Sequence, residues 1–288
     1  MVQIVDGNKI ADKILADLAG RIVKFHQAGF SPKLTAIQVG RDPASSLYIK
    51  IKQKKAAAIG LLVEAINYPA SISQPELQNA ISNLSEDKEV CGILVQLPLP
   101  NHLDGQKVLD TIPPELDIDC LTSVNKQKIV SGEEFLFKPP AAAAVLVILD
   151  YYHIDLPKED ILIVGSGDLI GKPLAAMFLK QNINFEIANR RTENFEELVK
   201  KASLIITGAG SPGLVGGEMI RENAILIDAG TTGSETGAIV GDVNIESVRD
   251  KARLLAPVPG GVGPVTIAML FRNVVASASR IFDTGKPR

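Results

Sequence analysis

Short apolar runs alternate along the chain with longer segments in which apolar residues recur at helical spacing. Apolar runs bounded by Gly, Pro and polar clusters are typical of buried parallel strands, and the segments between them fit the helices that cover such a sheet. The pattern predicts strands at residues 34–39, 61–66, 92–97, 161–164, 185–188, 204–207, 225–228 and 253–256, and terminal helices at 9–27 and 266–282. We therefore predict an α/β protein.

Two further helices in the first half are predicted from their start signals. Asp42 can cap a helix whose first turn contains Pro43, and Gly60 ends that helix. Ser73 has the spacing of a capping box with the glutamate three residues later, and a proline lies in the same first turn. Together with the first three predicted strands, these helices form one covered sheet.

A domain boundary is predicted near residue 140. The stretch 98–140 is rich in Pro, Asp and short polar segments and has no long periodic element. After it, the strand 161–164 is followed at once by a glycine-rich turn, as in nucleotide-binding doubly wound sheets. We predict a first domain over residues 1–139, a Rossmann-like doubly wound domain over 140–264, and a C-terminal segment, 265–288, that packs back on the first domain.

Composition narrows the function classes. Thirty basic and 33 acidic residues give a net charge of −3, so no excess positive charge is available for nucleic acid. The longest apolar run, residues 141–149, is shorter than the roughly 18 residues of a spanning helix, and the N-terminus has no apolar signal core. Two cysteines and three histidines offer neither a disulfide framework nor metal-site spacing. We expect a cytoplasmic protein without nucleic-acid, membrane or metal partners.

The turn GSGDLIG (residues 165–171) follows a predicted strand and precedes a predicted helix. Backbone N–H groups of Gly165, Ser166, Gly167 and Gly171 in such a turn can hold a phosphate. The third glycine comes one residue later than in a dinucleotide fingerprint, so a tight structural turn explains the motif about equally well.

The end of the next predicted strand carries two arginines, Arg190 and Arg191. In a doubly wound sheet this is the place of the adenosine ribose, and arginines there can pair with a 2′-phosphate. The pair therefore favours NADP over NAD as cofactor. A solvated basic turn is the alternative.

In the first domain, Tyr48 and Lys52 are four residues apart on one predicted helix face. A lysine beside a phenol can move protons if burial or a neighbouring cation lowers its pKa, and Lys50, Lys54 and Lys55 are candidates for that cation. The alternative is a lysine-rich helix face in water, with the tyrosine half buried.

Three more segments carry polar or rigid residues at strand ends or in loops. Gln96 falls at the end of a predicted strand, where ligands of open α/β sheets bind. Asp117 and Asp119 lie in one loop, where a carboxylate can bind ligand donors or cap a turn, and capping suits one of them. The string PVPGGVGP (residues 257–264) suits a rigid loop against a flat ligand or a plain tight connection.

Taken together, these segments resemble the methylenetetrahydrofolate dehydrogenase/methenyltetrahydrofolate cyclohydrolase family. The resemblance covers nearly the whole chain, in the family's order. The segments that carry it are VGRDPASSLYIKIK from Val39, GILVQLPLP from Gly92, LDIDCLTSVN from Leu116, GDVN from Gly241 and PVPGGVGPVTIAML from Pro257.

The resemblance implies a folate site on the first domain and NADP on the second, on either side of a cleft. Lys52 matches the catalytic lysine, Tyr48 the residue that stacks on the folate, Gln96 the lysine's hydrogen-bond partner and Asp119 the carboxylate that holds the pterin. The folate pocket is expected to be lined by Pro257, Pro259, Gly260 and Gly261.

The implied reactions are hydride transfer from 5,10-methylenetetrahydrofolate to NADP, then hydrolysis of the methenyl product to 10-formyltetrahydrofolate. The nicotinamide supplies the redox chemistry, while a lysine serves general acid–base catalysis. A place in one-carbon metabolism that supplies purine biosynthesis, and a homodimer, are further expectations from the resemblance.

The chain departs from the family pattern in the cofactor half. Pro139, Pro140 and the alanines 141–144 replace a Pro-Cys-Thr-Pro-x-Gly segment, and Ser166 replaces an arginine associated with the 2′-phosphate. Thr231 replaces an asparagine. Our hypothesis is that Arg190 takes over from the missing arginine. Two alternatives stay open: a cyclohydrolase with weak or lost dehydrogenase activity, and a catalytically silent folate-binding protein.

Overall fold

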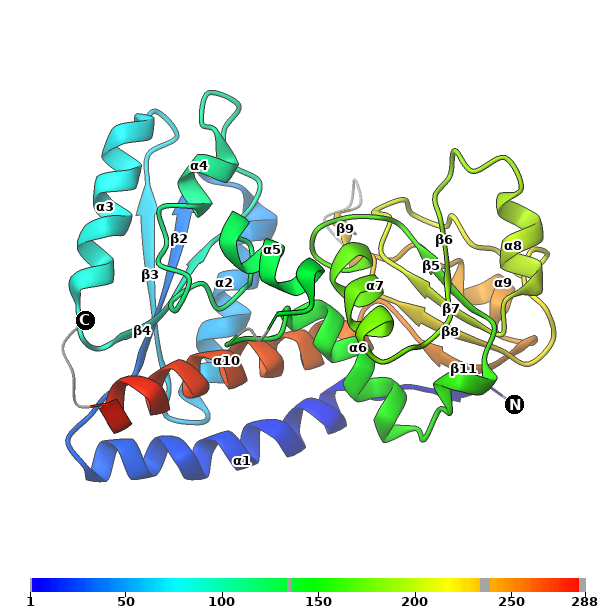
Figure 1. The fold of residues 1–288 in the computed structure, drawn as a ribbon, viewed down its shortest axis with the longest axis horizontal. Helices are drawn as coiled ribbons and strands as arrows, with labels where there is room; N and C mark the ends of the chain where they lie inside the picture. The colour runs from blue at the N-terminus through cyan, green and yellow to red at the C-terminus, as the bar shows by residue number, and fades with distance from the viewer. Residues whose placement is uncertain (1, 134–135, 234–238, 285–288) are drawn as a thin grey trace. The chain divides into compact units, whose positions relative to one another are not determined.

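The computed structural model describes residues 2–133, 136–233 and 239–284 of the 288-residue chain (Figure 1). Its elements form two compact units. The first consists mainly of Lys13–Lys128 with the chain from Ala268 onward, and the second mainly of Pro139–Ile267 with the residues up to Asp12. Each unit has its own parallel sheet, and the two are described separately.

The sheet of the first unit has three parallel strands in the order β3-β2-β4. The strands are β2 (Lys33–Val39), β3 (Leu62–Tyr68) and β4 (Val90–Val95), and the accompanying helices are α1 (Gly7–Gln27), α2 (Pro43–Ala57), α3 (Gln74–Glu86), α4 (Gly105–Leu109) and α5 (Ser123–Ser131). Leu77 and Ile81 on α3 belong to one buried cluster with Ile37 and Val95 of the sheet. This apolar contact holds the sheet that carries the candidate site.

Both predicted helix starts of this unit are confirmed. The Asp42 carboxylate accepts a hydrogen bond from the Ser45 N–H at 2.7 Å. Ser73 and Glu76 form the reciprocal capping box at the start of α3. The first of these caps fixes where α2 begins, and with it the face on which Tyr48 and Lys52 lie.

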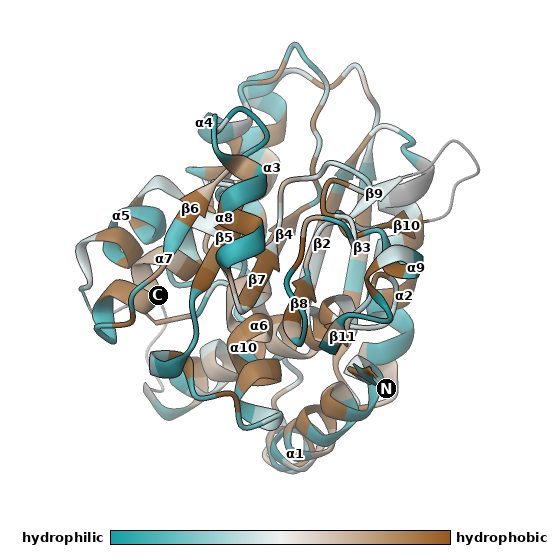
Figure 2. Ribbon diagram, turned by 90° about the vertical axis from the view of Figure 1, so that its right-hand side faces the viewer, coloured by the Kyte–Doolittle hydropathy of each residue, from teal (hydrophilic) through white to brown (hydrophobic). Residues whose placement is uncertain are grey.

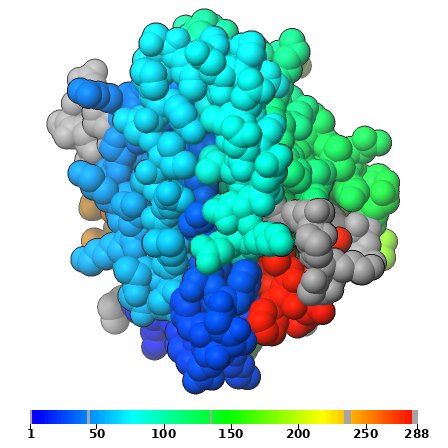
Figure 3. Space-filling view, turned by 90° about the vertical axis from the view of Figure 1, so that its left-hand side faces the viewer, coloured from blue at the N-terminus to red at the C-terminus, as the bar shows by residue number. Residues whose placement is uncertain are grey.

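The last helix, α10 (Val262–Thr284), packs beside α1 within the first unit (Figures 1 and 3). Arg21 donates to the Ser279 hydroxyl at 2.8 Å, and the Phe25 and Phe282 rings are 5.6 Å apart. Among the described helices, α10 alone has the length and composition of a membrane span, but 56% of that window is buried in the fold. A core helix accounts for such a composition.

The second unit contains a six-stranded parallel sheet in the order β1-β11-β8-β7-β5-β6. Its strands are β1 (Gln3–Ile4), β5 (Ile161–Val164), β6 (Glu186–Ala188), β7 (Leu204–Thr207), β8 (Ala224–Asp228) and β11 (Ala252–Ala256). The central strands are apolar along their length (Figure 2), as expected for a sheet covered on both faces. The covering helices are α6 (Pro140–Tyr151), α7 (Gly171–Lys180), α8 (Phe195–Lys201) and α9 (Ile245–Val248), and β9 (Thr232–Gly233) pairs with β10 (Ile239–Val240).

Strand order predicts where this sheet would bind a ligand. The chain passes from β5 to β6 on one side and then returns to β7 on the other side. In open α/β sheets, ligands bind at the carboxyl ends of the strands where the order reverses in this way. That point lies at the ends of β5 and β7.

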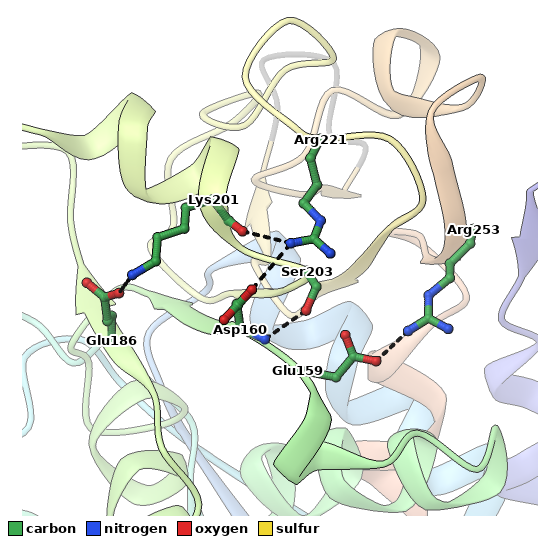
Figure 4. Close-up of polar contacts among 7 residues, drawn as sticks. All are labelled: Glu159, Asp160, Glu186, Lys201, Ser203, Arg221 and Arg253. Atoms are coloured by element: carbon green, nitrogen blue, oxygen red, sulfur yellow. Dashed lines mark hydrogen bonds and ion pairs between the residues drawn. The ribbon is translucent and has the colours of Figure 1, made fainter.

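Charged side chains connect the strand starts at the opposite edge of the same sheet (Figure 4). The ion pairs are Glu186–Lys201 at 2.9 Å, Asp160–Arg221 at 3.3 Å and Glu159–Arg253, and the Asp160 N–H donates to the Ser203 hydroxyl at 2.8 Å. These acids and bases are paired with one another. The charged groups at this edge therefore hold the strand starts to the neighbouring helix and loops.

The predicted strands and terminal helices are confirmed within a few residues, with three differences. Strand β4 ends at Val95, so Gln96 follows the strand instead of closing it. The helix α6 and the short strand β1 were not predicted, because an apolar alanine-rich run has no helical stripe and two residues carry no periodicity. Residues 285–288 of the predicted C-terminal segment lie outside the described residues.

Candidate functional site

Lys52 and Gln96 meet in the first unit. Lys52 lies on α2, and its ammonium group donates to Gln96 Oε1 at 3.1 Å. The Gln96 backbone N–H donates to the Ile37 carbonyl at 2.8 Å, so the residue stays attached to β2 although β4 has ended. The amide side chain can therefore hold the lysine nitrogen at the carboxyl end of the sheet.

Burial lowers the pKa of Lys52, and the negative charge of Asp119 partly opposes this effect. Of the two causes predicted for a lowered pKa, burial is the one that acts, and the candidate cations Lys50, Lys54 and Lys55 do not contribute. A lysine with a lowered pKa has a larger neutral fraction near pH 7, which a general base requires.

Tyr48 lies one helical turn before Lys52 on α2 and is half buried. The spacing of four residues puts both side chains on one helix face, as predicted. Burial raises the pKa of the Tyr48 phenol, so it stays protonated at neutral pH. It can offer a ring face and a hydroxyl, but no phenolate.

Asp117 and Asp119 have different surroundings in the loop that follows α4. Asp117 is only 1% exposed. Its carboxylate accepts from the backbone N–H groups of Leu121 at 3.0 Å and Thr122 at 2.9 Å, and from the Asn125 amide at 2.8 Å. Asp117 is therefore the capping residue of the pair, and Asp119 is the candidate for ligand binding.

Asp119 is electrostatically coupled to Lys52. Burial raises the pKa of its carboxyl group to about 6, with a lowering contribution from Lys52 and a raising one from Asp117. The group is thus largely ionised at neutral pH and becomes protonated in mild acid. The first unit therefore combines an amide-held lysine, a half-buried tyrosine and a carboxylate.

The loop 257–264 belongs to the second unit. It forms a tight turn in which the Gly261 N–H donates to the Pro257 carbonyl at 2.8 Å. The Gly7 N–H donates to the Gly260 carbonyl at 2.9 Å, and a Cβ on Gly7 would lie 1.8 Å from the Gly261 carbonyl oxygen. This close backbone contact holds the loop against the start of α1.

The glycine turn after β5 lies at the crevice of the second sheet. Gly165 has φ +110°, and a Cβ there would lie 2.6 Å from the Gly208 carbonyl oxygen after β7. A Cβ on Gly171 would lie 2.1 Å from the Gly165 carbonyl oxygen, whereas one on Gly167 would meet nothing within 4 Å. The first and third glycines thus serve close packing, and Ser166 and Gly167 face open space at the start of α7, where a phosphate fits.

Arg190 and Arg191 are exposed in the turn after β6. The turn is held by its own polar groups, since the Arg191 N–H donates to Asn189 Oδ1 at 2.9 Å and the Asn189 N–H to Thr192 Oγ1 at 3.0 Å. The arginines follow β6, and the glycine turn follows β5. Because β6 pairs directly with β5, the two turns leave neighbouring strands. This arrangement suits recognition of a phosphate by arginine.

Two buried aspartates, which sequence reasoning did not single out, organise the loops at the same crevice. Asp242 accepts from the N–H groups of Ala209 and Ser211, both at 2.6 Å, in the loop after β7. Asp228, at the end of β8, accepts from the N–H groups of Asp242 at 3.1 Å and Val243 at 2.9 Å. The sequence did contain a signal for both residues. Asp228 ends an apolar strand and Asp242 lies in the Gly-Asp-Val-Asn segment, and a buried carboxylate needs hydrogen-bond partners.

The residues that depart from the family pattern are packed or exposed as follows. The helix α6 starts at Pro140 without a side-chain cap, and its alanines 142–144 are buried. Thr231 is exposed two residues after the buried Ala229.

Within the described residues, His, Cys, Asp and Glu form no group of three or more that could hold a metal ion.

Comparison with known proteins places both units in one family. The model for the tetrahydrofolate dehydrogenase/cyclohydrolase catalytic domain matches residues 5–119, and that for the NAD(P)-binding domain of the same family matches residues 139–282. The bifunctional protein FolD of Bacillus cytotoxicus is 38% identical over 277 residues, with 96% of each chain covered. That of Lactobacillus delbrueckii subsp. bulgaricus is 36% identical over 280 residues, covering 97% of this chain and 98% of the relative.

Solved structures agree. The bifunctional FolD methylenetetrahydrofolate dehydrogenase/cyclohydrolase of Campylobacter jejuni has a TM-score of 0.92 at 35% identity, covering 97% of this chain and 99% of the other. The Trypanosoma brucei enzyme, solved with NADP cofactor and inhibitor, has a TM-score of 0.91 at 32% identity, covering 97% and 98%. The predicted family and α/β class with a Rossmann-like second sheet are thereby confirmed. This chain belongs to the tetrahydrofolate dehydrogenase/cyclohydrolase family.

Proposed function

We propose that this protein oxidises 5,10-methylenetetrahydrofolate with NADP and hydrolyses the methenyl product to 10-formyltetrahydrofolate. The observation that carries the proposal is the Lys52–Gln96 hydrogen bond of 3.1 Å in the unit that matches the family's catalytic domain. A lysine of lowered pKa, held by an amide and coupled to Asp119, is a proton-transfer device. This property argues against a silent folate-binding protein.

In the hydrolysis step, a water oxygen forms a bond to the amidinium-like methenyl carbon. Neutral Lys52 accepts the proton that this water loses, while Gln96 Oε1 holds the Lys52 nitrogen in position. The bond from the same carbon to one ring nitrogen then breaks as the hydroxyl group on that carbon loses its proton to solvent and becomes the formyl C=O. The nitrogen that leaves takes up the proton held by Lys52. The product retains the formyl group on the other nitrogen, and the step releases one proton overall.

Asp119 and Tyr48 orient the folate in this proposal. An ionised carboxylate accepts from the adjacent amino and ring N–H donors of a pterin as a bidentate pair. The raised pKa of Asp119, about 6, still leaves it mainly ionised at neutral pH. Tyr48 offers its ring to the flat folate from the face of α2 that carries Lys52.

NADP fits the second unit. The open space at Ser166 and Gly167 leaves the backbone of the turn before α7 accessible to the pyrophosphate, and the close packing at Gly165 and Gly171 brings that backbone into position. When bound, NADP would supply the acceptor for the hydride of the one-carbon bridge. Thr231, which follows the loop held by Asp228, contacts the cofactor from the neighbouring strand end.

Arg190 supplies the contact to the 2′-phosphate that Ser166 no longer provides, with Arg191 beside it. We expect the double variant Arg190→Ala/Arg191→Ala to raise KM for NADP at least about tenfold while KM for NAD changes less than about twofold, since only NADP has the phosphate. Arg249→Ala, which removes an exposed arginine elsewhere in the same unit, is the matched charge control. Equal effects of the double variant on both cofactors would overturn this assignment.

The activity itself is tested by supplying methenyltetrahydrofolate without nicotinamide. Hydrolysis that Lys52→Ala abolishes supports the proposal for the first unit, and no hydrolysis by the wild type contradicts it. Hydrolysis without any NADP-dependent oxidation of the methylene substrate would instead support a cyclohydrolase that has lost its dehydrogenase activity. The buried alanines 142–144 and Thr231 are the departures that make this second candidate worth separating.

The proposal also includes a cytoplasmic homodimer that binds neither nucleic acid nor membrane and whose formyl product supplies purine biosynthesis. The net charge of −3 and the family resemblance support it. Sedimentation equilibrium tests the assembly, with a mass near twice 30.7 kDa expected and a monomer as the contrary result.

A further inference from the structure

Asn273 is a buried polar residue on an apolar helix. It lies on α10 between Phe271 and Val274, which are fully buried, and is itself 5% exposed. Burying an amide is unfavourable unless its polar atoms find partners. A polar side chain at this position therefore indicates a specific requirement that an apolar residue would not meet.

The amide group of Asn273 links two separate segments of the first unit. Its nitrogen donates to the Ile118 carbonyl at 2.8 Å and to the Lys138 carbonyl at 2.9 Å. Both partners are acceptors, so the amide orientation is fixed by chemistry: only the NH₂ group can serve both. Three parts of the chain that are distant in sequence thus meet at one side chain.

The first of these carbonyls belongs to the peptide group that joins Ile118 to Asp119. Holding it fixes the orientation of the peptide plane from which the Asp119 Cα–Cβ bond departs. The residue before Asp119, Ile118, packs against Gly92 of β4. A Cβ added to Gly92 would lie 2.9 Å from the Ile118 side chain. On the following side, Cys120 has φ +60°, and the N–H groups of Leu121 and Thr122 bind the Asp117 carboxylate.

We propose that Asn273 is a positioning residue that sets where the Asp119 carboxylate lies for folate binding, through the Ile118–Asp119 peptide group. This inference rests on the proposed cyclohydrolase activity and deepens it. Asn273 acts only through the backbone of the loop. It extends the functional machinery to α10, a helix that was predicted only to pack on the first domain.

Ser277 provides a matched control on the same helix. It is 2% exposed, lies one turn after Asn273, and its hydroxyl donates to the Glu115 carbonyl at 3.3 Å in the same loop. Removing either side chain deletes a buried hydrogen bond between α10 and this loop. Only the Asn273 bond is adjacent to Asp119.

The test compares the wild type, Asn273→Ala and Ser277→Ala for hydrolysis of methenyltetrahydrofolate across pH. We expect Asn273→Ala to raise KM at least about fivefold with kcat within about threefold, and Ser277→Ala to stay within about twofold in both. We also expect the acid limb of the pH dependence of 1/KM, which follows ionisation of Asp119 for folate binding, to move down by about half a pH unit or more in Asn273→Ala. Burial is the largest cause of the raised Asp119 pKa, and a loosened loop exposes the group to water.

The charged and titratable groups coupled to Asp119 are Lys52 on α2, and Asp117 and Cys120 in its own loop, and both variants leave them in place. A merely structural role for Asn273 would lower the folded fraction and hence apparent kcat, with KM and the acid limb unchanged. That result would overturn the proposal. If circular dichroism shows that Asn273→Ala does not fold, Asn273→Ser replaces it in the test. This variant keeps one hydrogen-bond donor, so KM must again rise, but by a smaller factor.

Failure of the proposed function gives a different result, because the wild type then hydrolyses nothing. In that case the three proteins are compared by equilibrium binding of tetrahydrofolate. Weaker binding by Asn273→Ala alone would support the positioning role, and equal binding by all three would overturn it.

Discussion

Gly92, in the middle of β4, has no room for one more carbon atom. A Cβ at this position would lie 2.9 Å from both Cγ1 and Cγ2 of Ile118 and 3.4 Å from Cγ2 of Val274. Carbon atoms pack best at about 3.5–4.0 Å, so two of these three contacts are too short by more than half an ångström. Gly92→Ala must therefore displace Ile118, the residue directly before Asp119.

The expected loss of stability follows from the overpacking. Inserting a methyl group into a packed core typically costs about 1–3 kcal/mol in free energy of unfolding. For domains of this size, each kcal/mol lowers Tm by about 2–4 °C, so we expect a decrease of roughly 2–12 °C. The displacement of Asp119 should in addition raise KM for methenyltetrahydrofolate, because the carboxylate no longer lies where the pterin donors need it.

Gly20→Ala is the matched control. Gly20 is an exposed residue within α1 of the same unit, and a Cβ there would meet nothing within 4 Å. Replacing a helical glycine by alanine without strain stabilises by about 0.5–1 kcal/mol. The same substitution should thus have opposite effects at the two positions.

Thermal unfolding followed by circular dichroism, together with urea unfolding, measures both variants. The transition that includes β4 should move down in Gly92→Ala and up in Gly20→Ala. A Gly92→Ala protein as stable as the wild type would show that Ile118 does not pack closely on β4. The account of how the Asp119 loop is held would then be refuted.

Three further predictions concern charged groups of the two units. Lys52→Ala should lower the hydrolysis rate by about 10²–10⁴-fold, because it removes the general base, and should leave the circular dichroism spectrum unchanged. A rate within about tenfold of the wild type would contradict the role of Lys52 as a general base. The Asp119 carboxyl group has a pKa of about 6 in the folded protein and ordinarily 3.8, so its contribution to stability is fully present below pH 3.8 and is lost as pH rises through about 6. Asp119→Asn should therefore raise Tm more at pH 7 than at pH 4, and it should weaken folate binding. A change in Tm that does not depend on pH would contradict the raised pKa. Asp242→Ala leaves two backbone N–H groups of the loop after β7 without their acceptor, which should cost about 2–4 kcal/mol in free energy of unfolding. It should also raise KM for NADP, while hydrolysis of methenyltetrahydrofolate persists. Unchanged NADP kinetics would show that this loop does not touch the cofactor.

Local sequence signals were sufficient for the elements that present the catalytic groups. The Asp42 cap sets the start of α2, and a spacing of four residues places Tyr48 and Lys52 on one face. The end of an apolar run placed Gln96 next to the strand end where the structure has it, displaced by one residue. These predictions succeeded because capping and periodicity act within a few residues.

Long-range contacts could not be predicted in the same way. Asn273 and Ile118 are 155 positions apart, and no local pattern states which buried carbonyl an amide will meet. The sequence left two causes open for a lowered Lys52 pKa, burial or a neighbouring cation, because charges are visible in a sequence whereas burial is a property of the folded chain. The paired strands β1 and β11 are separated by most of the chain, and β1 has only two residues.

The central claim is that one chain carries both activities, and the most direct measurement is formation of reduced nicotinamide from 5,10-methylenetetrahydrofolate by the purified protein. It is made with NADP and in parallel with NAD, and 10-formyltetrahydrofolate is quantified in the same reactions. We predict an NADP-dependent signal that exceeds the NAD signal and is accompanied by the formyl product. No reduced nicotinamide with either cofactor would contradict the account for the second unit, and reduced nicotinamide without formyl product would contradict it for the first.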